Sequence, residues 1–198
     1  MARAIWTLGH SNRDLETFLK LLAAVGIERV ADVRRFPGSK RHPHFNRGAL
    51  EESLGAAGVA YDHVAEMGGR RGRRAPDSPN NAWRVEAFNA FADHMATPEF
   101  VAALDALAGR AESSRTAILC SEALPWQCHR RLIADALVVR GWDVRDIIGP
   151  GKVVPHALTP FARNSGGLRR LPGCPRSRCT SPASPWSRYR RQIRLVCR

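Results

Sequence analysis

Apolar residues fall along the first 160 positions in short runs that are separated by longer stretches with helical spacing. The short runs predict buried strands at 4–8, 29–33, 59–64, 117–120 and 144–148. Apolar positions three or four residues apart predict the intervening helices at 14–25, 47–57, 83–95, 98–110 and from 128 onward. This alternation predicts the α/β class, as a three-layer, Rossmann-like domain with a mostly parallel five-stranded sheet.

Polar residues follow several of the predicted strands. In open parallel sheets, ligands bind outside the carboxyl ends of the strands, at the point where the strand order reverses. With the common order 3-2-1-4-5, the first and fourth strands are neighbours at that point. His10 and Ser11 would then face the same crevice as the Cys120–Glu122 segment, with Asp32 and Arg34 beside it.

The C-terminal segment differs in composition from the rest of the chain. Ten of the 31 Lys and Arg residues, and none of the 18 acidic residues, lie in 163–198. The remainder holds 21 basic against 18 acidic residues, so its net charge is +3 of the total +13. We therefore predict one α/β domain over 1–163, followed by an Arg/Pro/Ser-rich tail over 164–198 that is mostly disordered.

Several classes of protein are disfavoured. The chain has no run of about 18 apolar residues and no signal-peptide core, so we expect a cytoplasmic protein without a membrane partner. Its five cysteines do not form a secreted disulfide framework. The standard Gly-rich nucleotide loops do not occur, and Cys174 and Cys179 lack further ligands to complete a metal set. No cofactor and no metal are expected.

Residues 117–137 (AILCSEALPWQCHRRLIADAL) hold the densest group of reactive side chains. Cys128 is predicted on the first turn of a helix, where unpaired N–H groups, the helix dipole and Arg130 favour a thiolate. It is either a nucleophilic or redox thiol, or a small buried apolar residue. Cys120, at the end of a buried strand, has the same alternatives, with packing the simpler interpretation. The two cysteines could also form a reversible disulfide.

Other polar side chains are candidates for acid/base chemistry. His10 either acts as a general acid/base or bonds to its own turn, and Glu122 either partners His10 or Cys128 or caps the following turn. Asp32 and Arg34 lie two apart on a strand, so both point to the same face. Their simplest interpretation is a salt bridge.

Two loops and one helix start are basic. The loop at 35–46, with Arg34 before it, combines Arg and Lys with Phe36, and the loop at 68–74 contains Arg70 and Arg71. Arg beside aromatic residues is typical of single-strand nucleic-acid binding. The helix start could hold a phosphate or carboxylate instead, through backbone N–H groups, His129 and Arg130.

Several motifs recur in a characteristic order over residues 4–163: TLGHS, DVRRFPGS with HFN after it, MGGRR, LCSE followed by CHRRLIA, and PHALTPFAR. This ordered set resembles the domain-of-unknown-function 488 family. The resemblance implies a cytoplasmic prokaryotic α/β domain with a Rossmann-like core, and it supplies candidate positions rather than a reaction. The positions are Gly9, His10, Ser11, Asp32, Arg34, Pro37, Ser39, Gly68, Gly69, Arg70, Cys120, Glu122, Cys128, His129 and Arg130.

These observations lead to one hypothesis and one alternative. The hypothesis is that the domain binds a small phosphate- or carboxylate-bearing substrate at the carboxyl end of the sheet, with Cys thiol chemistry. The candidate catalytic residues are Cys128, His10, Glu122 and Cys120, and the candidate substrate-binding residues are Ser11, Asp32, Arg34, Arg70, Arg71, His129 and Arg130. The alternative is a non-catalytic nucleic-acid-binding module that uses the Arg-rich loops.

Overall fold

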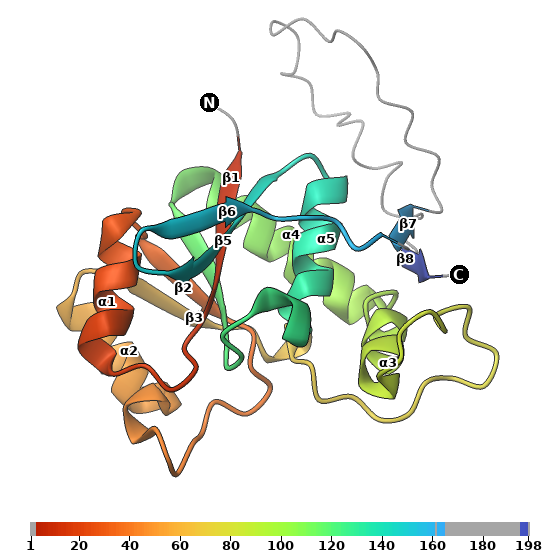
Figure 1. Ribbon diagram of the computed structural model, residues 1–198, viewed down its shortest axis with the longest axis horizontal. Coiled ribbons are helices and arrows are strands. Elements are labelled where there is room, and N and C mark those ends of the chain that lie inside the picture. Colours follow the sequence, from red (N-terminus) through yellow and green to blue (C-terminus); the bar gives the residue numbers. More distant parts are fainter. Residues whose placement is uncertain (1–2, 161, 165–194, 198) are drawn as a thin grey trace, which may run out of the picture.

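A six-stranded sheet forms the centre of the computed structural model, which describes residues 3–160, 162–164 and 195–197 (Figure 1). Its strand order is β3-β2-β4-β1-β5-β6. The strands are β1 (Ala4–Gly9), β2 (Arg29–Asp32), β3 (Ala60–His63), β4 (Thr116–Cys120), β5 (Asp143–Gly149) and β6 (Lys152–Pro155). All neighbouring pairs are parallel except β5 and β6, so the α/β class and the mostly parallel sheet are confirmed.

The sheet differs from the predicted one in two respects. The fourth strand lies between the first and the second, because Ala117 of β4 is paired with both Trp6 of β1 and Val30 of β2. The predicted order 3-2-1-4-5 is therefore wrong, although β1 and β4 are neighbours as expected. A sixth, antiparallel strand follows β5, because a tight turn with Gly151 at φ +64° reverses the chain.

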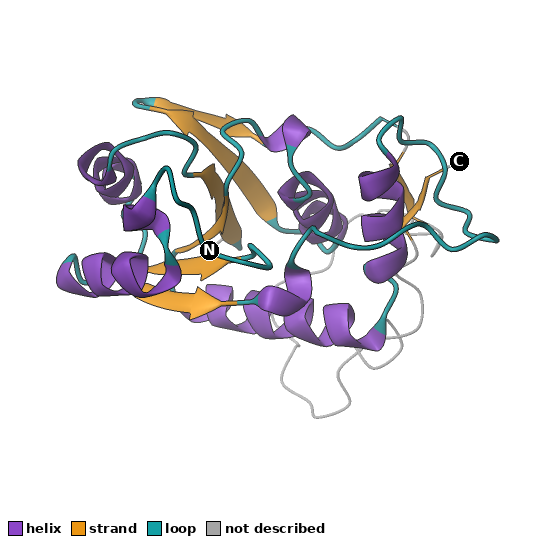
Figure 2. Cartoon of the chain, turned by 90° about the horizontal axis from the view of Figure 1, so that it is seen from below, coloured by secondary structure: helices purple, strands orange, loops and turns teal. Residues whose placement is uncertain are grey.

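Helices cover both faces of the sheet, as the view in Figure 2 shows. Leu50 of α2 packs in the hydrophobic core on one face, together with α1, and Leu104 of α4 packs in the core on the other, together with α3 and α5. Successive residues of β4 alternate between these cores: Leu119 belongs to the first and Cys120 to the second. The helices are α1 (Leu15–Ala24), α2 (Arg47–Ala56), α3 (Glu86–His94), α4 (Pro98–Ser113) and α5 (Arg130–Val139).

Side-chain caps mark the starts of two helices, α1 and α4. The carboxylate of Asp14 accepts the Thr17 N–H at 2.7 Å, and Thr97 caps α4 immediately before Pro98. Helix α5 begins at Arg130, two residues later than predicted, because the 3₁₀ turn η3 (Pro125–Gln127) precedes it.

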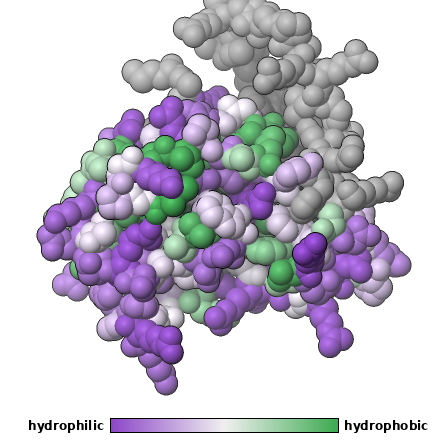
Figure 3. All heavy atoms as spheres, in the orientation of Figure 1, coloured by the Kyte–Doolittle hydropathy of each residue, from purple (hydrophilic) through white to green (hydrophobic). Residues whose placement is uncertain are grey.

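The C-terminal tail is described only at its two ends. Strand β7 (Ala162–Asn164) pairs antiparallel with β8 (Leu195–Cys197). Of the tail predicted to be disordered over 164–198, residues 165–194 and 198 lie outside the described residues. None of the described helices has the length and apolar character needed to cross a bilayer. On the face seen in Figure 3, hydrophobic residues form small groups among hydrophilic ones.

Candidate functional site

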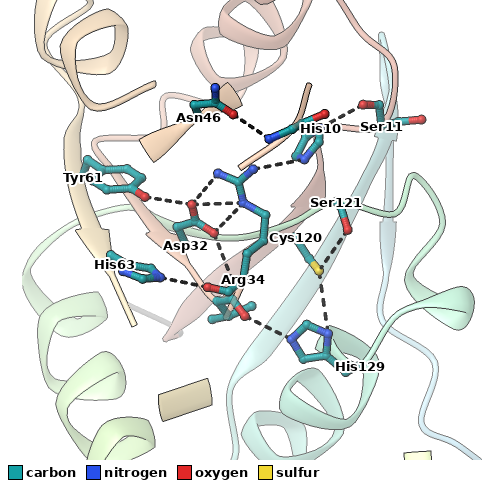
Figure 4. Close-up of polar contacts among 12 residues, drawn as sticks. His10, Ser11, Asp32, Arg34, Asn46, Tyr61, His63, Cys120, Ser121 and His129 are labelled. Atoms are coloured by element: carbon teal, nitrogen blue, oxygen red, sulfur yellow. Dashed lines mark hydrogen bonds and ion pairs between the residues drawn. The ribbon is translucent and has the colours of Figure 1, made fainter. Parts of the chain in front are cut away.

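The predicted site residues gather at the carboxyl ends of β1, β2 and β4, but they form two clusters on opposite faces of the sheet. Asp32 and Arg34 follow Val30, which packs on the α1/α2 face. Cys120 follows Ile118, which packs on the α4/α5 face. Because side chains alternate along a strand, the carboxylate and the thiol point in opposite directions from the sheet. Figure 4 shows the first cluster at the same edge as Cys120 and His129 of the second.

The first cluster is a buried salt bridge with two additional partners. The Arg34 guanidinium donates from Nε to Asp32 Oδ1 at 2.9 Å and from Nη2 to Oδ2 at 2.6 Å. The hydroxyl of Tyr61 donates to Oδ2 at 2.8 Å. The salt bridge predicted for this pair is therefore present, and its guanidinium is occupied within the fold. Sequence reasoning missed Tyr61, since only the neighbouring strand places it there.

His10 connects this cluster to the end of β1. Its Nε2 accepts from Arg34 Nη1 at 3.2 Å, and its Nδ1–H donates to the Ser11 carbonyl at 2.8 Å. Its ring stacks on Phe45 with 4.3 Å between centroids. Burial and the Arg34 charge lower the pKa of His10 to about 4, so the ring is neutral near pH 7. Ser11 itself has φ +52°, in the left-handed region that non-glycine residues rarely adopt.

The second cluster consists of two thiols around one imidazole. Cys120 Sγ and Cys128 Sγ each lie 3.7 Å from His129 Nδ1. The opposite ring nitrogen, Nε2, donates to the Val33 carbonyl at 3.2 Å. The backbone N–H of Arg130 donates to Cys128 Sγ at 3.5 Å. Both cysteines are buried.

The surroundings of the two thiols shift their pKa values in opposite directions. The hydrogen bond from the Cys128 thiol, with a smaller effect of the neighbouring His129 ring, holds the pKa of Cys120 well below its usual range, against the effect of burial. Burial and the neighbouring Cys120 raise the pKa of Cys128 well above its usual range. The helix start was expected to favour a thiolate at Cys128, whereas burial acts against the charged form of this residue. Cys128 precedes α5 and lies in the core, where desolvation opposes its charged form.

Two glycines allow a loop to pack directly on this cluster. A Cβ on Gly69 would meet His129 Nδ1 at 2.4 Å and Cγ at 2.5 Å, and a Cβ on Gly68 would meet the Arg35 backbone at 2.7 Å. Only residues without a side chain permit this approach. The loop at 68–74 therefore covers the imidazole that contacts both thiols.

Arg130 holds the loop after β4 in place. Its Nη1 donates to the Glu122 carbonyl at 2.5 Å, its Nη2 to the Ala123 carbonyl at 2.9 Å, and its Nε to Thr7 Oγ1 at 3.4 Å. The side chain is buried, so these contacts favour a positioning role over anion binding. The Glu122 side chain is exposed, and among the described residues the acid/base contacts predicted for it with His10 or Cys128 are not formed.

The two basic loops meet at this edge. Arg35 Nη1 donates to the Arg70 carbonyl at 2.5 Å, and both side chains are exposed. Arg71 instead donates to the carbonyls of Gly68 and Glu66, at 2.8 and 2.7 Å, and so fixes its own loop.

A third buried polar network holds the segment after β6. His156 Nδ1 bonds to Asp146 Oδ2 at 2.8 Å, and its Nε2 lies 3.2 Å from Asp135 Oδ1. Thr159 donates to Asp135 and Thr7 to Asp146, both at 2.6 Å. Burial alone would lower the pKa of His156, but the two carboxylates outweigh it and raise the pKa to about 9. His156 and Thr159 both belong to the PHALT motif of the sequence. The sequence alone does not indicate that they contact Asp135 and Asp146.

Comparison with known proteins identifies the family. Neither curated proteins nor solved structures give a match. A family model described as "Domain of unknown function DUF488" matches residues 14–137. This range includes both thiols, His129, the salt bridge and the loop with Gly69. Because it spans more than half of the sequence, the chain belongs to the DUF488 family.

Proposed function

We propose that the domain binds a small anionic substrate, bearing a phosphate or carboxylate, at the carboxyl end of its sheet. The observation that carries this proposal is the contact between the two basic loops. Arg35 Nη1 donates to the Arg70 carbonyl at 2.5 Å, which brings two arginines with exposed side chains together on one rim. Exposed guanidinium groups bind phosphate and carboxylate in bidentate geometry.

The reactive groups lie next to this rim. Gly69 precedes Arg70 and packs on the ring of His129, which contacts the thiols of Cys120 and Cys128. An anion held by Arg70 would therefore lie next to the loop residue that packs on His129. The buried Arg34 and Arg130 position these elements, since their donors are used within the fold.

Calorimetric titration of the full chain with inorganic phosphate and with succinate tests this proposal. We expect saturable binding that is about 10-fold weaker in Arg70→Ala, because the lost charged hydrogen bond is worth about 1.4 kcal/mol or more. Arg145→Ala is the matched control, since Arg145 is an exposed arginine paired with Asp143 at the start of β5. Equal weakening by both variants, or no binding of either anion, would contradict the proposal.

One observation favours nucleic acid as a second candidate ligand. The Phe36 side chain is 66 % exposed, and the Arg35 guanidinium carbon lies 5.5 Å from its ring centroid. An exposed aromatic ring beside an arginine can stack on a base while the charge contacts a phosphate. Phe36 also lies on the same loop as the anion rim.

Binding of a single-stranded oligonucleotide at several salt concentrations distinguishes the two ligands. If nucleic acid is the ligand, the affinity falls steeply with salt, and Phe36→Ala weakens it by about 1–3 kcal/mol. A small-anion site predicts no effect of Phe36→Ala on phosphate or succinate binding.

A further inference from the structure

We infer that Cys120, Cys128 and His129 form a binding site for a zinc ion. Among the described residues these three make a group whose ligand atoms lie within 4.8 Å of one another. Two thiolates and one imidazole are the donor set of known Cys₂His zinc sites. The spacing of these residues does not match a known zinc motif, because seven residues separate the cysteines and His129 directly follows the second.

The distances within the cluster match those around a tetrahedral ion. With Zn–S of about 2.3 Å and Zn–N of about 2.0–2.1 Å, a sulfur and a nitrogen of one tetrahedron are about 3.6 Å apart. Cys120 Sγ and Cys128 Sγ both lie 3.7 Å from His129 Nδ1. The three donors therefore need little movement to surround one ion.

The imidazole already has the orientation that a zinc ligand requires. A carbonyl oxygen only accepts hydrogen bonds, so His129 Nε2 carries the proton that it donates to Val33 at 3.2 Å. In the neutral ring this leaves the lone pair on Nδ1, facing both sulfurs. The single lone pair on Nδ1 can accept a hydrogen bond from one thiol, whereas a cation between the three atoms can bind both sulfurs and the nitrogen. A backbone carbonyl partner on the other nitrogen is the usual support for a zinc-bound histidine.

Charge and burial also favour a divalent ion. Both sulfurs are buried, and two thiolates without a cation would leave two negative charges away from water. Zinc displaces the thiol protons to solvent, and its charge balances the two thiolates. The Arg130 N–H at 3.5 Å from Cys128 Sγ supplies a hydrogen bond to one ligand sulfur.

The fourth position of the tetrahedron is left for water or a substrate. Catalytic zinc sites keep three protein ligands and one open position. In that position zinc would receive the anionic group of the proposed substrate, and this last step alone rests on the proposed function.

The test is zinc loading of the full chain. The protein is stripped with a chelator under reducing conditions, loaded with Zn²⁺ in buffer free of phosphate and carboxylate, desalted, and analysed by mass spectrometry for metal content. We expect one zinc per chain, lost in Cys120→Ser, Cys128→Ser and His129→Gln. A variant with Cys174, Cys179 and Cys197 all changed to Ser is the matched control and should keep its zinc. Circular dichroism reports whether each variant folds.

Two results would overturn the inference. One is wild-type protein that holds no stoichiometric zinc after loading. The other is zinc lost in the control variant but kept in the three ligand variants. If a ligand variant does not fold, the absorption spectrum of wild-type protein loaded with Co²⁺ tests the site instead. Intense visible bands with sulfur-to-metal charge transfer support the site, and a weak octahedral spectrum contradicts it. Phosphate and carboxylate are absent from these zinc and cobalt experiments. Their results therefore do not depend on whether the proposed anion site exists.

Discussion

The imidazole of His129 donates its Nε2–H to the Val33 carbonyl at 3.2 Å. This bond joins the turn before α5 to the segment after β2 and fixes the direction in which Nδ1 points. The two thiols that face Nδ1 come from β4 and from the residue before His129. The cluster thus joins the segment after β2 to two segments that are close in sequence, the end of β4 and the turn before α5.

Gly69→Ala should disturb the cluster without removing any of its side chains. The added Cβ would meet the ring of His129 at 2.4 Å, so the ring or the loop must move. We expect a loss of about 1–3 kcal/mol in the free energy of unfolding and zinc binding weakened by about 10- to 100-fold. Urea denaturation and competition with a zinc-binding dye measure the two effects. Gly72→Ala is the control, since its Cβ would meet no atom within 4 Å. Equal effects of the two substitutions would argue against close packing on His129.

His156→Gln should strongly destabilise the fold. His156 lies between the carboxylates of Asp135 and Asp146, at 3.2 and 2.8 Å, and its removal leaves both without a buried positive partner. We expect a loss of about 3 kcal/mol in the free energy of unfolding, measured with urea near neutral pH. His63→Gln is the matched control, because His63 makes one hydrogen bond, to the Arg34 carbonyl, and should cost about 1 kcal/mol. A similar small loss for both would show that His156 is uncharged in the fold.

The same histidine predicts a dependence of stability on alkaline pH. Its pKa is about 9 in the folded chain against 6.5 in the unfolded chain, so protonation favours folding. This contribution is fully present below about pH 6.5 and is lost as the pH rises through about 9. Urea midpoints of the wild type should therefore fall across this window, and the difference between wild type and His156→Gln should shrink. A constant difference across the window would rule out this titration.

Asp32→Asn should cost far more than Tyr61→Phe, although both remove one partner from the same cluster. The first change leaves the Arg34 guanidinium buried without a counter-charge, at about 3–5 kcal/mol. The second removes one hydrogen bond of 2.8 Å, at about 1 kcal/mol. Thermal and urea unfolding compare the variants. Similar costs would mean that solvent reaches Arg34 and compensates its charge.

Local patterns predict the elements of this fold better than their arrangement. The helix predicted at 98–110 is Pro98–Ser113, because Thr97 and Pro98 mark its start unambiguously. The helix predicted at 83–95 starts later, at Glu86. Strand order depends on contacts between distant segments, which is why the position of β4 between β2 and β1 was not foreseen.

The candidate site shows the same division between local and distant information. Spacing by two residues correctly places Asp32 and Arg34 on one face. The spacing does not show which face of a strand packs against which layer of helices. The placement of Asp32 and Cys120 on opposite faces of the sheet was therefore not predictable. Likewise, no spacing rule indicates that Gly69 packs on His129 or that Tyr61 reaches Asp32.

X-ray absorption spectroscopy at the zinc edge tests the central claim most directly, namely that Cys120, Cys128 and His129 act as one centre. The sample is the zinc-loaded full chain with Cys174, Cys179 and Cys197 changed to Ser, which leaves two cysteines. We predict two sulfur ligands at about 2.3 Å and one imidazole nitrogen at about 2.0–2.1 Å. A first shell of oxygen and nitrogen without sulfur would contradict the account.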